Sequence, residues 1–153
     1  MLLQPGHWLG KGSLLAEGQS LGQEVSCDVD VSHEDVEFAI AAEVDIREMG
    51  ARTVSVRVVA NEEGTYNVDV RTLVGVYTGV AKLDSAPNLG LLWNEDATTY
   101  LTFTVFSIRG GFGFRGFMRE GGTSTYTWEV AFSLKQEVVG GGNVVSLANR
   151  RKR

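Results

Sequence analysis

The sequence is poor in the side chains that carry covalent and metal chemistry, with one cysteine and two histidines. The single cysteine, Cys27, can form no internal disulfide, which fits a reducing compartment. It alternates with valines, so we expect it to be a small inward-facing core residue. No Cys and His residues have zinc-ligand spacing, and no serine or cysteine stands in a nucleophile motif. We therefore predict no catalytic residues and no metal ligands.

Long apolar runs are also missing. No run approaches the roughly 20 residues that a bilayer-crossing helix needs, so we expect no membrane span and no membrane partner. Residues 1–6 lack both the basic region and the apolar stretch of a secretory signal. These two absences predict a cytoplasmic protein.

Positive charge is scarce, since 14 basic residues face 19 acidic ones and the net charge is −5. An acidic excess argues against a broad nucleic-acid surface, which needs clustered Lys and Arg. Two segments depart from this balance. Residues 109–122, RGGFGFRGFMREGG, resemble flexible RNA-binding segments, and the glycine-rich segment 138–153 ends in four consecutive cations.

Residues 111–119 also fit a β-strand, and we favour that interpretation. One face would carry Phe112, Phe114 and Met118, and the other would carry Arg115, Phe117 and Arg119. The alternation does not decide which face points inward.

Period-two alternation dominates the rest of the chain, and it places every second side chain on one face of a strand. In STYTWEVAFSL, one face carries Tyr126, Trp128, Val130 and Phe132, whereas the other is small or polar. Turn-forming Gly, Asn, Asp and Ser clusters separate such segments. Ten strands are predicted, at 7–16, 22–31, 36–46, 52–60, 65–73, 75–84, 89–94, 98–108, 111–119 and 124–137, with bulges or bends at Gly75 and Gly79.

About ten antiparallel strands must curl or split, because twist accumulates across a sheet and open edges promote aggregation. The candidates are a sandwich and a closed barrel, and the short sequential turns favour an up-and-down barrel. No linker divides the chain, so residues 1–153 are predicted to form a single all-β domain with 138–153 as its C-terminal segment.

The opening stretch, PGHWLGKGSLL, carries the most specific motif. Gly6, Trp8, Gly10 and Gly12 form G-x-W-x-G-x-G, which resembles the first strand of nitrobindins and, more broadly, of calycin barrels such as lipocalins and fatty-acid-binding proteins. The resemblance implies a ten-stranded barrel with a ligand cavity. An inward Trp8 would plug one end, and the glycines would let the strand bend across it.

Nitrobindins bind heme through a histidine near the C-terminus, but this chain has no histidine after His33. We expect His7 to point outward beside the inward Trp8, and His33 to lie in the turn after the second strand. Heme binding is therefore disfavoured, and no cofactor is predicted.

These observations favour a barrel that binds a small apolar or amphipathic molecule. The predicted ligand-binding residues are Trp8, Phe38, Ile40, Val56, Tyr66, Val68, Tyr100, Arg115, Trp128 and Phe132. Two alternatives stay open: a cyclase or isomerase that uses the cavity with a Tyr, an Arg or His33 as acid or base, and a barrel that contacts RNA through residues 109–119 and the basic tail. The oligomeric state is also open, a homodimer included.

Overall fold

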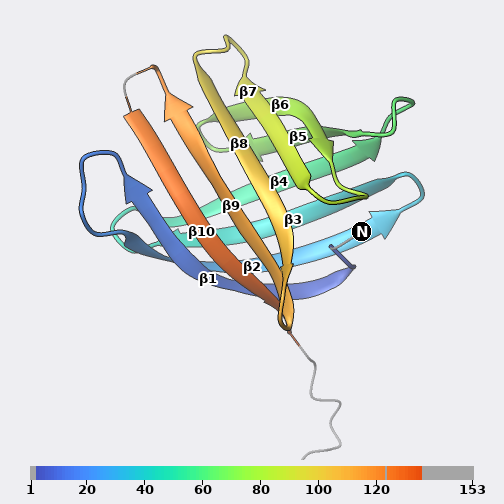
Figure 1. The fold of residues 1–153 in the computed structure, drawn as a ribbon, viewed down its shortest axis with the longest axis horizontal. Helices are drawn as coiled ribbons and strands as arrows, with labels where there is room; N and C mark the ends of the chain where they lie inside the picture. Colours follow the sequence, from blue (N-terminus) through green and yellow to red (C-terminus); the bar gives the residue numbers. More distant parts are fainter. Residues whose placement is uncertain (1–2, 123, 136–153) are drawn as a thin grey trace, which may run out of the picture.

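A computed structural model describes residues 3–122 and 124–135 of the chain, and these residues form ten β-strands (Figure 1). Their bounds are β1 Gly6–Ala16, β2 Gln23–Glu34, β3 Glu37–Ile46, β4 Gly50–Ala60, β5 Tyr66–Thr72, β6 Gly75–Lys82, β7 Asn88–Asn94, β8 Thr99–Ile108, β9 Gly111–Glu120 and β10 Ser124–Leu134.

The strands form a closed antiparallel barrel rather than a sandwich. Each strand pairs with its neighbours in sequence, and β1 closes the barrel by pairing with β10 from Trp8 opposite Leu134 to Ala16 opposite Tyr126. The predicted all-β up-and-down barrel of ten strands is confirmed. Within the described residues there is no helix, and hence none long and apolar enough to cross a membrane.

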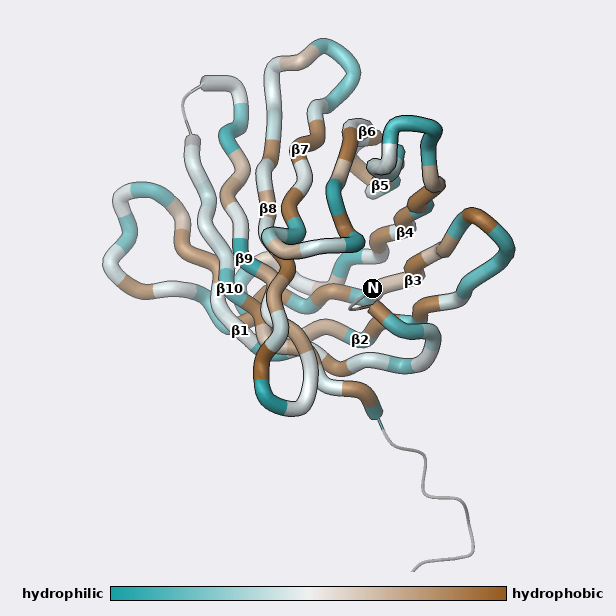
Figure 2. Tube along the Cα trace, turned by 45° about the vertical axis from the view of Figure 1, so that its right-hand side comes forward, coloured by the Kyte–Doolittle hydropathy of each residue, from teal (hydrophilic) through white to brown (hydrophobic). Residues whose placement is uncertain are grey.

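The alternation seen in the sequence separates the inside of the barrel from the outside, and hydropathy changes repeatedly along most strands (Figure 2). Val130 and Phe132 are buried in the core, whereas Glu129, Ala131 and Ser133 between and beside them are exposed. The interior is packed with apolar side chains because strand residues of one parity meet only one another across the barrel.

Strand bounds differ from the predicted ones by at most three residues over the described part of the chain. The largest difference is at β2, which continues to Glu34, so His33 is a strand residue and not a turn residue. The predicted end of the last strand at 137 and the segment 138–153 lie outside the described residues.

No bulge is found at Gly79, since the pairing of β6 with β5 runs through it without interruption, and Gly75 is the first residue of β6, where this ladder ends opposite Thr72. Gly79 has a different role. A Cβ atom there would lie 2.0 Å from the carbonyl oxygen of Leu91 on the adjacent strand. Glycine at this position therefore permits a close approach of two backbones.

Two glycines of the opening motif, Gly10 and Gly12, also lie where a side chain would clash with its surroundings. A Cβ atom on Gly12 would lie 1.9 Å from the carbonyl oxygen of Glu129, and one on Gly10 would lie 2.5 Å from the ring of Phe132. Gly10 thus leaves room for an aromatic ring inside the barrel, and Gly12 lets β10 pass close to β1.

Candidate ligand-binding cavity

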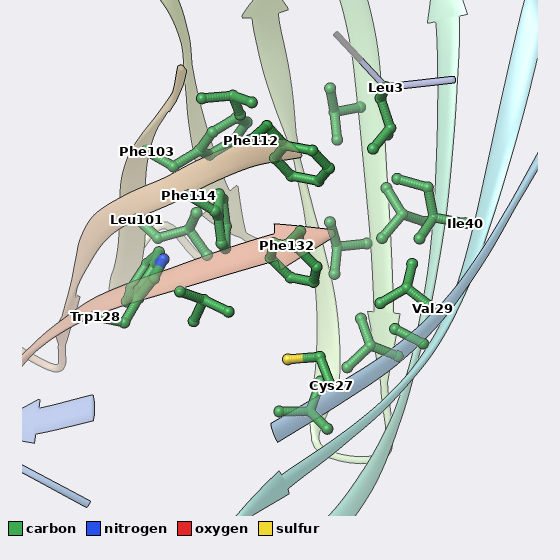
Figure 3. Close-up of a pocket in the computed structure, with 18 of the residues that line it drawn as sticks. Leu3, Cys27, Val29, Ile40, Leu101, Phe103, Phe112, Phe114, Trp128 and Phe132 are labelled. Carbon is green, nitrogen blue, oxygen red and sulfur yellow. The ribbon is translucent and has the colours of Figure 1, made fainter. Parts of the chain in front are cut away.

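The barrel encloses a cavity of about 400 Å³ (Figure 3). Its wall is built from inward-facing aliphatic and aromatic residues of strands on all sides of the barrel, with Leu3 and Leu83 contributed by the segments outside the strands. Figure 3 shows Phe103, Phe112, Phe114, Trp128 and Phe132 on one side and Leu3, Cys27, Val29 and Ile40 on the other. A cavity of this size lies in the range that small-molecule sites occupy.

Aromatic packing closes one end of the cavity. Trp8 meets Phe112 edge to face at 5.0 Å between ring centroids, and Phe112 stacks on Phe132 at 4.8 Å. The indole N–H of Trp8 donates to the carbonyl oxygen of Gln4 at 2.9 Å, which fastens the N-terminal segment across this end. All three rings are less than 9% exposed. The inward Trp8 predicted from the G-x-W motif is confirmed.

The wall is less complete toward the other end. The ladder between β4 and β5 runs only from Ser55 to Ala60, whereas β4 is paired with β3 from Gly50 to Val59. Residues 50–54 thus have no partner in β5. Val54 lies in this unpaired stretch and lines the cavity, as does Ile46 at the end of β3. We call this side the mouth of the cavity.

The cavity has almost no polar groups in its wall. Asn88 is buried there, but in the orientation that satisfies its hydrogen bonds its amide nitrogen donates to the carbonyl oxygens of Leu83 and Ser85 at 3.1 and 3.2 Å. The indole N–H of Trp128 is buried and has no hydrogen-bond partner among the described residues. Since an unpaired charge in such surroundings would be costly, the cavity suits hydrocarbon.

Cys27 is the one thiol in the wall and is not disulfide-bonded. Burial raises the pKa of this thiol from 9.0 to about 11. It is neutral at physiological pH, and a neutral thiol is a poor nucleophile. Its inward, apolar placement agrees with the expectation from its alternation with valines.

Five of the ten predicted ligand-binding residues line the cavity: Ile40, Val56, Val68, Trp128 and Phe132. Three more belong to its closed end. Trp8 is described above, and Phe38 and Tyr66 meet edge to face at 6.2 Å. The Tyr66 hydroxyl donates to Asp84 at 2.8 Å, and burial followed by this carboxylate raises the pKa of Tyr66.

The remaining two, Tyr100 and Arg115, do not line the cavity. Tyr100 packs edge to face on Phe117, and Arg115 pairs with Glu129 and lies 4.9 Å over the ring of Phe106. Both side chains lie on the outer surface of the barrel, so their expected inward placement is wrong. In the strand β9, Phe112 and Phe114 face inward and the arginines face outward, which settles the orientation that the sequence left open.

Neither of the two histidines lines the cavity. His7 is on the outer face, as predicted, where its Nδ1 lies 2.6 Å from Asp30 and its Nε2 lies 2.7 Å from Asp28. Nε2 of His33 is 3.1 Å from the carbonyl oxygen of Leu3, and its ring lies 5.3 Å from that of Phe38. Neither imidazole reaches into the interior.

Sequence reasoning missed much of the aromatic side of the wall, namely Leu101, Phe103, Phe112 and Phe114 of β8 and β9. The alternation in these strands was visible, but both of their faces carry large apolar residues. A usable signal lay in the glycines. Gly90 and Gly116 leave space for the rings of Phe103 and Trp128 on the inner face.

Comparisons with known proteins support the fold but do not assign the chain to a family. No protein-family model matches the sequence, and a search of curated proteins finds no match. Among solved structures, the chain is similar to the S-type phycobiliprotein lyase CPES from Guillardia theta, with a TM-score of 0.65 and 10% sequence identity over 88% of this chain and 89% of that one. At this identity the likeness concerns the fold alone, and the protein is a ten-stranded antiparallel barrel of calycin-like fold.

Proposed function

We propose that the protein binds a small apolar or amphipathic molecule in the barrel cavity. The observation that carries the proposal is the cavity of about 400 Å³, whose wall is almost wholly hydrocarbon. Its closed end holds three packed rings, and its mouth lies beside the unpaired stretch of β4. The likeness to a phycobiliprotein lyase agrees with a barrel of this kind.

The wall indicates how such a ligand lies. A carboxylate or a phosphate at the closed end would meet only rings and the already bonded amide of Asn88. An amphipathic ligand therefore enters tail first and leaves its polar end at the mouth. Arg115 cannot neutralise a buried anion, because it lies on the outer surface with Glu129.

Heme does not fit the residues present, although the opening motif resembles that of nitrobindins. Both histidines lie outside the cavity, and the Cys27 thiol is held neutral with its pKa near 11. Iron in the cavity would find no imidazole and no thiolate among the described residues. The proposed ligand is thus one that needs no metal coordination.

No specific observation favours either of the two alternative functions. For the enzyme, neither His33 nor any tyrosine or arginine of the described residues lines the cavity as a candidate acid or base. In residues 109–119, Phe112 and Phe114 face inward and Arg115 is paired with Glu129, which leaves Phe117 as the one outward phenylalanine of this segment for stacking on RNA bases.

The proposal is tested by native mass spectrometry of protein purified from cells and by titration with the fluorescent probe nile red. We expect bound probe to quench Trp128 in the wall, and Trp128→Phe to lose most of that quenching. Trp93 on the outer surface gives the matched control, Trp93→Phe, which should keep it. A flat titration of protein freed of any bound molecule would contradict the proposal.

A further inference from the structure

The outer surface of the barrel has two sides of opposite character. Over β2 to β5 it carries mostly charged and small polar residues, such as Asp28, Asp30, Glu43 and Arg57. Over β6 to β9 it is mainly apolar. We call this second side the apolar outer face, and define it by Val76, Val80, Leu89, Leu91, Trp93, Tyr100, Thr102, Thr104, Phe106 and Phe117.

Strand register makes this face continuous. Val80 lies opposite Leu91, Leu91 opposite Thr102, and Thr102 opposite Phe117, so one row of side chains crosses four strands. Trp93 and Tyr100 are paired in the next row. Figure 1 shows β6, β7, β8 and β9 side by side in this part of the barrel.

The threonines within this face present methyl groups rather than hydroxyls. The hydroxyl of Thr102 donates to the carbonyl oxygen of Gly90 at 3.0 Å, and that of Thr104 donates to the carbonyl oxygen of Asn88 at 2.9 Å. Both hydrogen bonds are made to β7 of the same barrel. Covering these residues would therefore leave neither hydroxyl unsatisfied.

Several large apolar side chains of this face are exposed to solvent. Val80, Leu89 and Trp93 are 47%, 46% and 40% exposed, and Val76 is 38% exposed. Contiguous exposed apolar patches with a polar rim are typical of protein–protein contact sites. A standard interface takes about 800 Å² from each partner, with an apolar centre and a polar rim.

The charges around the face have the arrangement of such a rim. Lys82 lies at the end of the face near the β6–β7 turn, where its ammonium donates to the carbonyl oxygens of Ser85 and Pro87, and Glu95 and Asp96 lie in the turn at the opposite end. Glu129 offsets Arg115, and Arg119, opposite Tyr100 in the strand register, donates to the carbonyl oxygen of Gly122. When two copies stack with their strands reversed, the end with Lys82 of each copy meets the acidic end of the other.

From this exposure, continuity and charge arrangement we propose that the apolar outer face binds the same face of a second copy in a two-fold symmetric dimer. Two twisted sheet faces pack well in this manner, and the two-fold axis places each face on its own equivalent. A lipid surface fits less well, because the acidic residues at one end of the face would be repelled by anionic headgroups.

The test is sedimentation equilibrium from about 1 μM upward, the range in which interfaces of standard size associate. We expect wild type at twice the chain mass of 16.6 kDa. Leu91→Glu should weaken the dimer at least tenfold, because it places a charge at the centre of the face. Ser55→Glu adds the same charge to the polar outer side of β4 and should leave the dimer unchanged.

Two further variants, Trp93→Gln and Glu95→Lys, test the same face in case Leu91→Glu does not fold. Trp93→Gln removes an exposed ring, so it should fold even where Leu91→Glu does not, and it should also weaken the dimer. Glu95→Lys should weaken it and reduce its sensitivity to salt. A wild-type protein that is monomeric at about 100 μM, a Leu91→Glu variant as dimeric as wild type, or sedimentation of the protein with phosphatidylcholine vesicles would each overturn the proposal. A protein that binds no ligand in the cavity but is dimeric would not contradict the proposed dimer.

Discussion

The cavity predicts a limit on the length of hydrocarbon that the protein can hold. A volume of 400 Å³ accommodates about 13 groups of the size of a water molecule or a methylene, at about 30 Å³ each. Each buried methylene contributes about 0.8 kcal/mol, which is about a fourfold change in the dissociation constant. In a series of straight-chain alcohols, affinity should therefore rise about fourfold per carbon and level off near 12 or 13 carbons.

Ala42→Phe tests this limit from the inside of the barrel. Ala42 lines the cavity, and the change adds six carbon atoms, or about 180 Å³ by the same conversion. About seven methylenes then still fit, so dodecanol, with five methylenes displaced, should lose about 4 kcal/mol of binding free energy. The plateau in the alcohol series should move to about seven carbons.

The neighbouring residue supplies the control. Ala41 is exposed on the outer face of β3, so Ala41→Phe makes the same chemical change without entering the cavity. Its plateau should match that of wild type. The measurement is displacement of nile red, followed by calorimetry for the tighter ligands. A plateau at the same chain length in both variants would refute the assignment of the cavity as the binding site.

Three other changes test the close contacts and the chemistry of the wall. Gly12→Ala places a Cβ atom 1.9 Å from the Glu129 carbonyl oxygen, where about 3.3 Å is needed. The strands β1 and β10 must separate, and we expect urea denaturation to show a loss of about 2–4 kcal/mol, against little change for Ser13→Ala on the outer side of the same strand. The raised pKa of Cys27, about 11 instead of 9.0, predicts about 100-fold less thiolate at pH 8 than in the unfolded chain. Iodoacetamide should accordingly modify the folded protein that much more slowly, and a rate like that of the unfolded chain would contradict the buried placement. Hemin should give no sharp histidine-ligated Soret band, and His33→Ala should leave any weak hemin absorbance unchanged; a sub-micromolar complex lost in that variant would show relocated ligation.

Much of the fold could be predicted because two signals in the sequence agree. Alternation marks each strand, and Gly, Asn, Asp and Ser clusters mark each turn, so neither bounds nor order needed tertiary information. The inward Trp8 could be placed from the G-x-W motif, and alternation then placed the preceding residue, His7, on the other face. The pattern thus determined which residues share a face wherever one face was clearly polar.

The same reasoning explains why half of the site could be predicted. Ile40 and Val56 were assigned to the cavity because Glu43 and Arg57 mark the outer faces of their strands. Tyr100 was misplaced because β8 lacks such a marker, and its neighbours Leu101 and Thr102 fit either side. The mouth of the cavity depends on where β4 and β5 cease to pair, which is a property of register and cannot be derived from the periodicity of either strand alone.

The ambiguity of β6 to β9 has a physical cause that bears on function. A strand whose two faces are both apolar is expected when both faces are covered, as in the interior of an α/β protein. In this barrel the inner face of these strands lines the cavity, and the outer face with Leu91, Trp93 and Phe117 is covered by no other part of the described chain. The residues that made the inward direction hard to predict are thus the residues from which a second copy is inferred. Leu91→Glu should then affect assembly and Ala42→Phe should affect ligand binding, each without the other, because the two side chains lie on opposite sides of the barrel wall.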